Sequence, residues 1–183
     1  MKKIILTVFA AVSLLLYSTP SFALLNFSVG IPTSHTYSGK DTSGNDIGSD
    51  GVSGYFIQIG LPLLPGIGMD SYKTKIKCAS CDKELKVWTS MYNLYYLLPI
   101  PIINLTIGLG TGKTQYEFGG VSGDDGTASQ WYTSIGIPLL PLFDIHFSYR
   151  SISSKIEATS GDNKGKKDDL GGNLMGLGIG FNF

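Results

Sequence analysis

The chain has 183 residues, with 14 basic and 14 acidic side chains, so its formal net charge is zero. Charged residues make up only 15% of the chain, against about 25% in typical domains. No nucleic-acid partner is expected, because the charge shows no concentrated basic face. The length is that of one domain.

The first 23 residues have the pattern of a secretion signal. Lys2 and Lys3 form a positive start, residues 4–17 an apolar run, and Ser21-Phe22-Ala23 a small-x-small cleavage site. An uncleaved anchor is the alternative, but the apolar run is short for a bilayer-spanning helix, which needs about 20 residues. We expect cleavage, which leaves residues 24–183 as the mature domain.

Apolar and polar residues alternate with period two in most of the mature chain, which indicates β-strands with two different faces. The alternating segments are residues 25–31, 54–61, 88–98, 103–110, 130–137, 143–150 and 175–183. A weaker strand is predicted at about residues 68–77.

Three apolar proline turns, at residues 61–65, 98–101 and 137–141, separate pairs of these strands. Their first prolines are 37 and 39 residues apart, a period that indicates a repeated β-hairpin. Four hairpins make eight strands, and an even number suits a closed antiparallel barrel. The predicted fold is an all-β, eight-stranded, up-and-down transmembrane barrel.

The strand at residues 143–150 indicates which face is outside. One face is entirely apolar or aromatic, and the other carries Asp144, His146, Ser148 and Arg150. The apolar faces of eight strands cannot all point into so narrow an interior. We therefore predict a polar lumen and an apolar outer surface, as in a membrane barrel. Glycines on the inner faces leave room for a few large side chains, namely Phe56, Tyr95 and Tyr132.

Asp144, His146 and Arg150 are expected to form a polar network in the lumen, with Lys73 and Lys75 of the weak third strand. A buried charge without a partner is strongly destabilising, and a narrow lumen supplies partners across the barrel. A one-residue slip of the third strand would reverse its faces. In the register expected here, the outward residues are Tyr72, Thr74 and Ile76.

Cys78 and Cys81 lie in one of the polar connections. An oxidising compartment favours a disulfide between them. The alternatives are a metal site, for which no second Cys/His cluster lies nearby, and a redox motif, which belongs at a helix start. We expect a bridged loop tip.

The connections also predict the orientation. The proline turns are short, whereas the other connections are mostly longer and polar, so the turns are expected in the periplasm and the loops outside. Two interfacial aromatic girdles are expected. The loop-side girdle would contain Tyr37, Tyr55, Trp88, Tyr116 and Trp131, and the turn-side girdle Tyr96, Phe143 and Phe183.

The signal segment, the eight strands and the terminal Gly-Phe-Asn-Phe resemble the small eight-stranded bacterial outer-membrane barrels of the OmpX and OmpA-barrel type. In that group, a terminal aromatic residue with apolar residues at alternate positions is read by the barrel assembly machinery. Phe183, Phe181, Ile179 and Leu177 match that signal. The resemblance implies an outer-membrane location among lipid and lipopolysaccharide. The proline turns also resemble those of an uncharacterised set of small proteobacterial barrels.

Catalysis is not expected. His146 and Ser148 share one strand face and faintly resemble the His-x-Ser pair of eight-stranded lipid A deacylases. However, Glu157 falls on the opposite face, and His146 lies at the periplasmic end. The acidic runs at residues 122–126 and 162–169 lack the spacing of a calcium loop, so neither a metal nor a cofactor is expected.

The expected function is that of a non-enzymatic, monomeric barrel with a filled lumen, acting in envelope structure or surface interaction. A narrow channel for ions or very small solutes is the first alternative. A lipid-modifying enzyme is the second. Fold alone does not decide among them.

Overall fold

The computed structural model describes residues 25–38, 47–61, 63–77, 85–100, 103–118, 121–140, 142–157 and 167–182. Their strands are β1 (Asn26–Tyr37), β2 (Gly48–Gly60), β3 (Gly66–Lys77), β4 (Leu85–Pro99), β5 (Asn104–Phe118), β6 (Val121–Leu140), β7 (Phe143–Glu157), β8 (Lys167–Asp169) and β9 (Gly172–Asn182). The predicted signal segment, Cys78, Cys81 and Phe183 lie outside the described residues. No described helix is long and apolar enough to cross a membrane.

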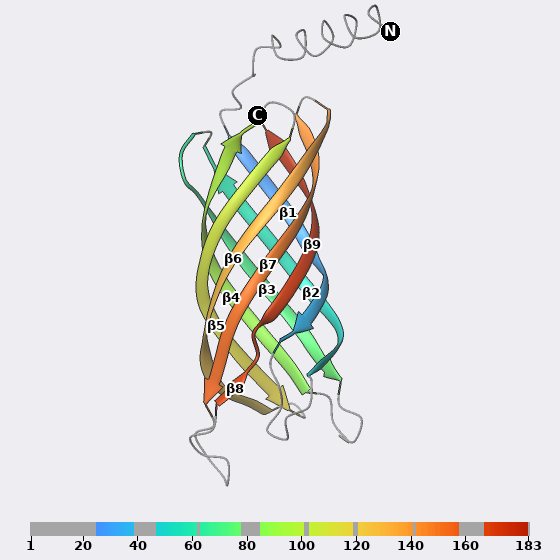
Figure 1. Cartoon of the computed structure of the whole chain (residues 1–183), viewed down its shortest axis with the longest axis vertical. Helices are drawn as coiled ribbons and strands as arrows, with labels where there is room; N and C mark the ends of the chain where they lie inside the picture. Colours follow the sequence, from blue (N-terminus) through green and yellow to red (C-terminus); the bar gives the residue numbers. More distant parts are fainter. Residues whose placement is uncertain are drawn as a thin grey trace, which may run out of the picture.

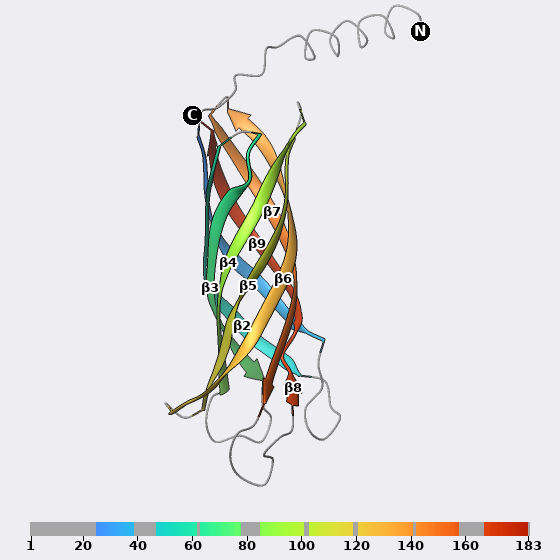
Figure 2. The same ribbon diagram turned by 90° about the vertical axis from the view of Figure 1, so that its left-hand side faces the viewer.

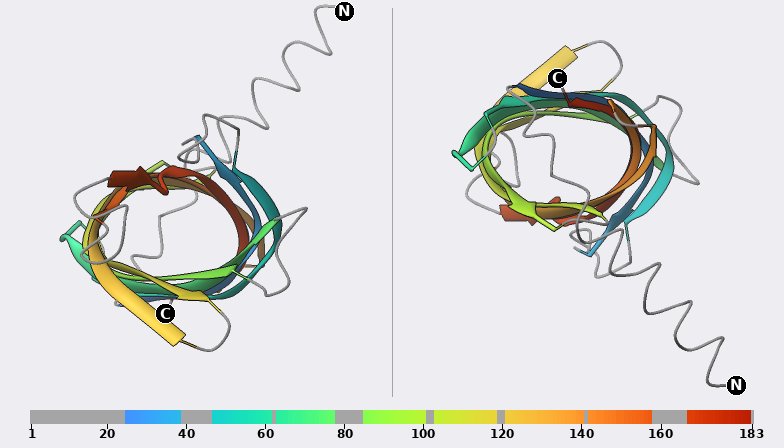
Figure 3. Two further views of the ribbon diagram at one scale, coloured as in Figure 1. Left: turned by 90° about the horizontal axis from the view of Figure 1, so that it is seen from below. Right: turned by 90° about the horizontal axis from the view of Figure 1, so that it is seen from above.

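The strands close into an antiparallel barrel (Figures 1 and 3). Strands β1 to β7 pair in chain order, and β9 pairs with both β1 and β7. The short β8 continues the ladder of β9 along β7, since Asp169 pairs with Lys155 and Gly172 pairs with Ile152. Strands β8 and β9 therefore occupy one position in the ring, and the predicted eight-stranded barrel is confirmed.

The barrel is elongated and its strands are tilted (Figures 1 and 2). Its upper end in these views, where β1 begins and β9 ends, is called the turn end below. The opposite end, where β1, β3, β5 and β7 finish, is called the loop end. A tilted closed sheet satisfies the backbone hydrogen bonds of every strand without leaving an edge.

The apolar residues of the alternating pattern lie outside. The exposed fractions are, for example, 58% for Ile31, 59% for Leu94 and 60% for Phe147. Glycines on the inner faces accommodate the large inward rings. A Cβ atom on Gly108 would overlap the ring of Tyr132. This glycine therefore leaves room for a large inward side chain, as predicted.

The third strand faces the opposite way from the expected register. Tyr72 and Thr74 are 2% and 0% exposed, whereas Lys75 is exposed and Lys73 lies on the same outer face. The assignment of Lys73 and Lys75 to the lumen is therefore wrong. The two lysines lie where β3 approaches the loop end, so their charges lie beyond the apolar belt.

A second difference concerns Tyr37, which was expected in the loop-side girdle. A register shift in β1 between Pro32 and Ser34 reverses the facing of the following residues. A β-bulge places one extra residue in a strand, so the side chains beyond it change face. Tyr37 is consequently inside, 7% exposed, with its ring centroid 4.3 Å from that of His35.

Candidate functional site

A cluster of amides and one carboxylate occupies the lumen at the turn end. Asp144 Oδ2 accepts hydrogen bonds from Asn104 Nδ2 at 2.7 Å and Asn182 Nδ2 at 3.1 Å. Its Oδ1 lies 3.3 Å from Nδ1 of His146. Asn26 Nδ2 donates to Asn182 Oδ1 at 2.6 Å. These contacts join β1, β5, β7 and β9 just inside the turn-end opening.

A polar cavity of about 20 Å³ lies beside this cluster. That volume has room for about one water molecule. Its walls include Ser28, Gln58, Asn104, Thr106 and Asp144. The cavity is therefore far smaller than a typical ligand pocket, which spans about 300–1,000 Å³.

Two tyrosines lie in the lumen near this cavity. Tyr132 is 1% exposed, and its hydroxyl accepts a 2.7 Å hydrogen bond from Gln58 Nε2. Ser28 Oγ donates to Gln58 Oε1 at 3.1 Å. The Tyr95 hydroxyl donates to Asn26 Oδ1 at 3.2 Å. Each polar tip of the two rings thus has a partner inside the barrel.

An ion pair crosses the middle of the barrel. Arg150 Nε donates to Asp70 Oδ2 at 3.0 Å, and the two residues are 1% and 0% exposed. Strands β7 and β3 are four steps apart in either direction around the ring, so they face each other across the lumen. Arg150 also donates to Ser148 Oγ at 2.5 Å, while Gln130 Nε2 donates to Asp70 Oδ2 at 2.5 Å and Asn93 Oδ1 at 2.7 Å.

Aromatic rings cover the guanidinium group. Its central carbon lies 3.6 Å from the ring centroid of Phe56 and 4.9 Å from that of Tyr132. Such cation–π contacts contribute most where both partners are desolvated. Arg150 is therefore held inside the barrel by a carboxylate, a hydroxyl and two rings.

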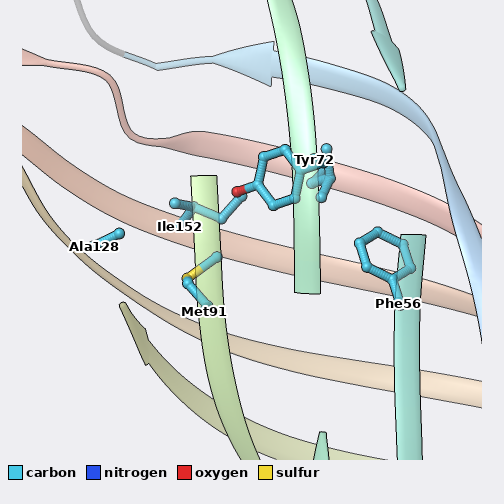
Figure 4. Packing of buried hydrophobic residues seen from close by; sticks show 6 residues of the cluster. Phe56, Tyr72, Met91, Ala128 and Ile152 are labelled. Carbon is cyan, nitrogen blue, oxygen red and sulfur yellow. The ribbon is translucent and has the colours of Figure 1, made fainter. Parts of the chain in front are cut away.

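An apolar layer follows toward the loop end. Figure 4 shows Phe56, Tyr72, Met91, Ala128 and Ile152 of this cluster, whose sixth member is Leu174. Met91 and Leu174 are each 0% exposed. Hydroxyl residues lie next along the strands: Thr89 and Thr114 oxygens are 3.1 Å apart, and His35 Nδ1 lies 2.8 Å from Thr74 Oγ1.

A second apolar cluster lies nearer the loop end. Its buried members are Tyr37, Val87, Ile156 and Leu170. Tyr116, another expected girdle residue, packs against this cluster from β5. The two apolar clusters interrupt the polar lining of the described part of the lumen.

The structure places Asp144, His146 and Arg150 inside, but in two separate clusters. Asp144 and His146 belong to the turn-end group, and Arg150 pairs instead with Asp70, which the sequence analysis missed. One signal was available. Asp70 lies on the same strand face as Tyr72, so an outward Tyr72 would have directed a carboxylate toward the membrane.

His146 and Ser148 do not form a catalytic pair. His146 contacts Asp144, and the Ser148 hydroxyl accepts a hydrogen bond from Arg150. A serine nucleophile needs a base within hydrogen-bond reach, and here the guanidinium occupies that place. Among the described residues, no three His, Cys, Asp or Glu side chains are grouped so that they could hold a metal ion.

Lys73 has partners on the outer surface. Its Nζ lies 4.1 Å from the ring centroid of Trp88 and 3.9 Å from Glu117 Oε2. Trp88 Nε1 donates to Glu117 Oε2 at 3.2 Å. The tryptophan ring is 43% exposed, so it occupies the outer surface as expected for an interfacial aromatic.

The C-terminal pattern lies on the outer face of β9. Leu177 and Ile179 are each 39% exposed, and Phe181 is half-buried. The Phe181 ring centroid is 5.9 Å from that of Phe143 on β7 and 6.5 Å from that of Phe27 on β1. Phe181 thus lies at the turn end of β9, between β7 and β1.

No protein-family model matches the sequence, and no curated protein matches it. Solved structures do match the fold. The outer membrane protein OprG from Pseudomonas aeruginosa is similar with a TM-score of 0.55 and 11% identity, over 88% of this chain and 96% of that one. Neisserial surface protein A matches with a TM-score of 0.50 and 10% identity, over 87% and 96% of the two chains. The chain thus has the fold of the eight-stranded outer-membrane β-barrels.

Proposed function

We propose that this chain is an integral protein of a bacterial outer membrane, whose sealed and non-enzymatic barrel holds its loop-end connections at the cell surface. Its role is structural in the envelope or in surface interaction. The barrel functions as a monomer in lipid and lipopolysaccharide, and reaches the membrane through the barrel assembly machinery.

The outer surface supports the membrane location. Large apolar residues are exposed on neighbouring strands around the ring, including Ile57, Leu94, Ile107, Ile135, Phe147 and Leu177. Contiguous apolar surface of this kind is a liability in water but suits the hydrocarbon of a bilayer. The buried charges Asp70 and Arg150 face the interior, as in other membrane barrels.

The filled lumen is the observation that carries the proposed role. A channel needs a path along which ions stay hydrated, yet Arg150, Phe56 and Tyr132 fill the middle. Met91 and Leu174, each 0% exposed, lie in the apolar layer that follows. The turn-end cavity has a volume of only about 20 Å³, which favours a scaffold over a channel.

Planar-bilayer recording on the refolded protein tests this role. We expect no reproducible unit conductance in concentrated potassium chloride. A channel would instead give unit steps of current. If ions passed Arg150 inside the lumen, the ion selectivity of these steps would change in Arg150→Gln. Lipid A mass spectrometry with and without the gene tests the enzymatic alternative, for which we expect identical spectra.

Cysteine accessibility provides a second test that does not depend on current. In a Cys78→Ser/Cys81→Ser background, Met91→Cys should resist a small water-soluble thiol reagent while the barrel is folded. Lys113→Cys is the matched control on the neighbouring strand, because the Lys113 side chain is 71% exposed. Equal labelling of both positions in the folded protein would mean that water fills the lumen.

A further inference from the structure

The described part of the lumen holds two buried carboxylates, which differ in their counter-charge. Asp70 is paired with Arg150, whose Nε lies 3.0 Å from Oδ2. Asp144 is 3% exposed, and its ionic contact among the described residues is with His146, which is charged only when it is protonated. A buried charge without a partner is strongly destabilising. Asp144 therefore requires another positive charge whenever His146 is neutral.

The hydrogen bonds of Asp144 suit its ionised form. Its Oδ2 accepts from Asn104 Nδ2 and Asn182 Nδ2, and its Oδ1 lies 3.3 Å from His146 Nδ1. An ionised carboxylate only accepts hydrogen bonds, and each of its oxygens has about two lone-pair positions. The two amides orient the carboxylate without cancelling its charge, and one position on Oδ1 remains for another ligand.

The small polar cavity beside this carboxylate is lined mainly by oxygen acceptors. Its volume of about 20 Å³ has room for one particle the size of water. The amide nitrogens of two wall residues are directed at protein acceptors, since Asn104 donates to the carboxylate and Gln58 to the Tyr132 hydroxyl. Thr106 and Ser134 add hydroxyl oxygens to the wall. Its described residues include no lysine or arginine.

Two glycines of the cavity wall leave room around the carboxylate. A Cβ atom on Gly180 would lie 2.6 Å from both oxygens of Asp144, and one on Gly136 would lie 3.0 Å from Oδ1. Such distances are too short for an unstrained contact. A larger residue at either position would therefore take up the space in which a ligand could reach the carboxylate.

We propose that this cavity binds one small monovalent cation, of the size of sodium. Asp144 Oδ1 supplies the negative charge, and the hydroxyl oxygens of Thr106 and Ser134 replace part of the ion's hydration shell, as oxygen dipoles do in ion-selective sites. A water molecule would fit the same space but would leave the carboxylate without a counter-charge. The ion thus has the place at Asp144 that Arg150 has at Asp70.

The charge of the site favours a monovalent ion over a divalent one. One carboxylate balances a single positive charge, whereas a divalent ion would leave a net charge buried among neutral groups. The described residues also contain no group of three His, Cys, Asp or Glu side chains. A site made of one carboxylate and neutral oxygens therefore suits an alkali ion better than calcium or a transition metal.

Urea unfolding of the refolded barrel in neutral detergent micelles tests the site. The midpoints are compared in sodium chloride and in choline chloride at equal ionic strength, because choline is too large for the cavity. A ligand that binds only the folded state raises stability as its concentration rises. Sodium should therefore raise the midpoint above its value in choline. Asp144→Asn should abolish this difference, and Asp125→Asn, which changes an exposed carboxylate, should retain it.

Two further variants separate the ligands from the charge. Ser134→Ala keeps the carboxylate and removes one oxygen of the wall, so a higher sodium concentration should be needed for the same midpoint. Ser153→Ala changes an exposed serine of β7 and should behave like the wild type. His146→Gln removes the alternative positive charge and should keep the sodium effect.

A direct measurement does not depend on the folding of any variant. The side-chain amide signals of Asn104 and Asn182 in the NMR spectrum of the wild-type barrel should shift during a sodium titration and stay unchanged in choline. Equal midpoints in the two salts for both the wild type and His146→Gln would overturn the site and leave a water molecule in the cavity. A sodium effect that persists in Asp144→Asn would place the ion elsewhere and overturn it as well.

Discussion

Arg150 and Asp70 join opposite walls of the barrel, with Nε and Oδ2 3.0 Å apart and both side chains buried. The pair connects β7 to β3, which are remote from each other in the hydrogen-bonded ring. Hydrogen bonds between neighbouring strands do not fix the distance between opposite walls. A contact across the lumen therefore makes the cross-section of the barrel harder to deform. In the proposed role, the same contact also obstructs the path that a solute would need.

Asp70→Asn should destabilise the barrel by about 3–5 kcal/mol, because it leaves the Arg150 charge buried without a carboxylate. Urea unfolding followed by the mobility of unboiled samples on gels measures this loss. The control is Asp125→Asn, which changes an exposed carboxylate and should leave stability unchanged. Asp70→Leu/Arg150→Met should recover much of the loss, since an apolar pair leaves no buried charge. A wild-type midpoint for Asp70→Asn would mean that the ion pair does not hold the walls together.

Gly108→Ala should cost about 1–3 kcal/mol, the usual range for overpacking a filled interior. The added methyl would overlap the Tyr132 ring. In a Tyr132→Ala background the same change should cost little, so the two substitutions should be strongly non-additive. Unfolding midpoints of the four proteins in this cycle give the coupling. Additive effects would show that Gly108 is required for a reason other than the ring.

Strict alternation made most of this fold predictable. In an alternating strand, only the choice of which set of residues faces the lumen remains open. In β7, the polar Asp144 and the apolar Phe147 decide that choice. The same rule failed on β3 because Lys73 and Lys75 lie past the apolar belt, where polarity no longer distinguishes lumen from exterior. The inward facing of Tyr37 could not be foreseen, since the β1 bulge is a matter of register with β9.

Partners across the lumen were also beyond reach of the sequence. Alternation assigns Arg150 to the interior, but the strands that face one another depend on how the ring closes and how far the register is staggered. Asp144 is closer than Asp70 to Arg150 in the sequence, and it carries the same charge as Asp70. It nevertheless lies in the turn-end cluster, where it accepts a hydrogen bond from Asn104. The polar composition of the lumen was therefore predictable, whereas its division into two clusters was not.

Ile107→Arg should destabilise the barrel by about 2–4 kcal/mol if this side chain meets lipid at mid-bilayer. Its exposed fraction is 49%. Thr111→Arg lies on the same face of β5 nearer the loop end, and should cost only about 0–1 kcal/mol. Both are compared by unfolding in phospholipid vesicles. Equal costs at the two depths would contradict an apolar belt that ends between these residues.

Cys78 and Cys81 should be bridged and face the outside of the cell. A membrane-impermeant maleimide should label intact cells only after reduction. Labelling without reduction would show free thiols. If reduced cells label only after lysis, either the loop end faces the periplasm or the cysteines are covered. A loop end in the periplasm would make the predicted orientation wrong. A Cys78→Ser/Cys81→Ser strain controls for other envelope thiols.

Deleting Phe183 should reduce assembly in cells more than it reduces stability. The rim already holds Phe181 between Phe27 and Phe143, and one further aromatic contributes little to a closed sheet. Recognition by the assembly machinery, however, is expected to depend on the terminal aromatic. We therefore expect low membrane levels and periplasmic degradation of the truncated chain, but near-normal refolding in detergent. Phe183→Trp is the matched control and should assemble normally. Normal cellular levels after the deletion would remove the terminal residue from the assembly signal, and failed refolding in vitro would assign it a structural role instead.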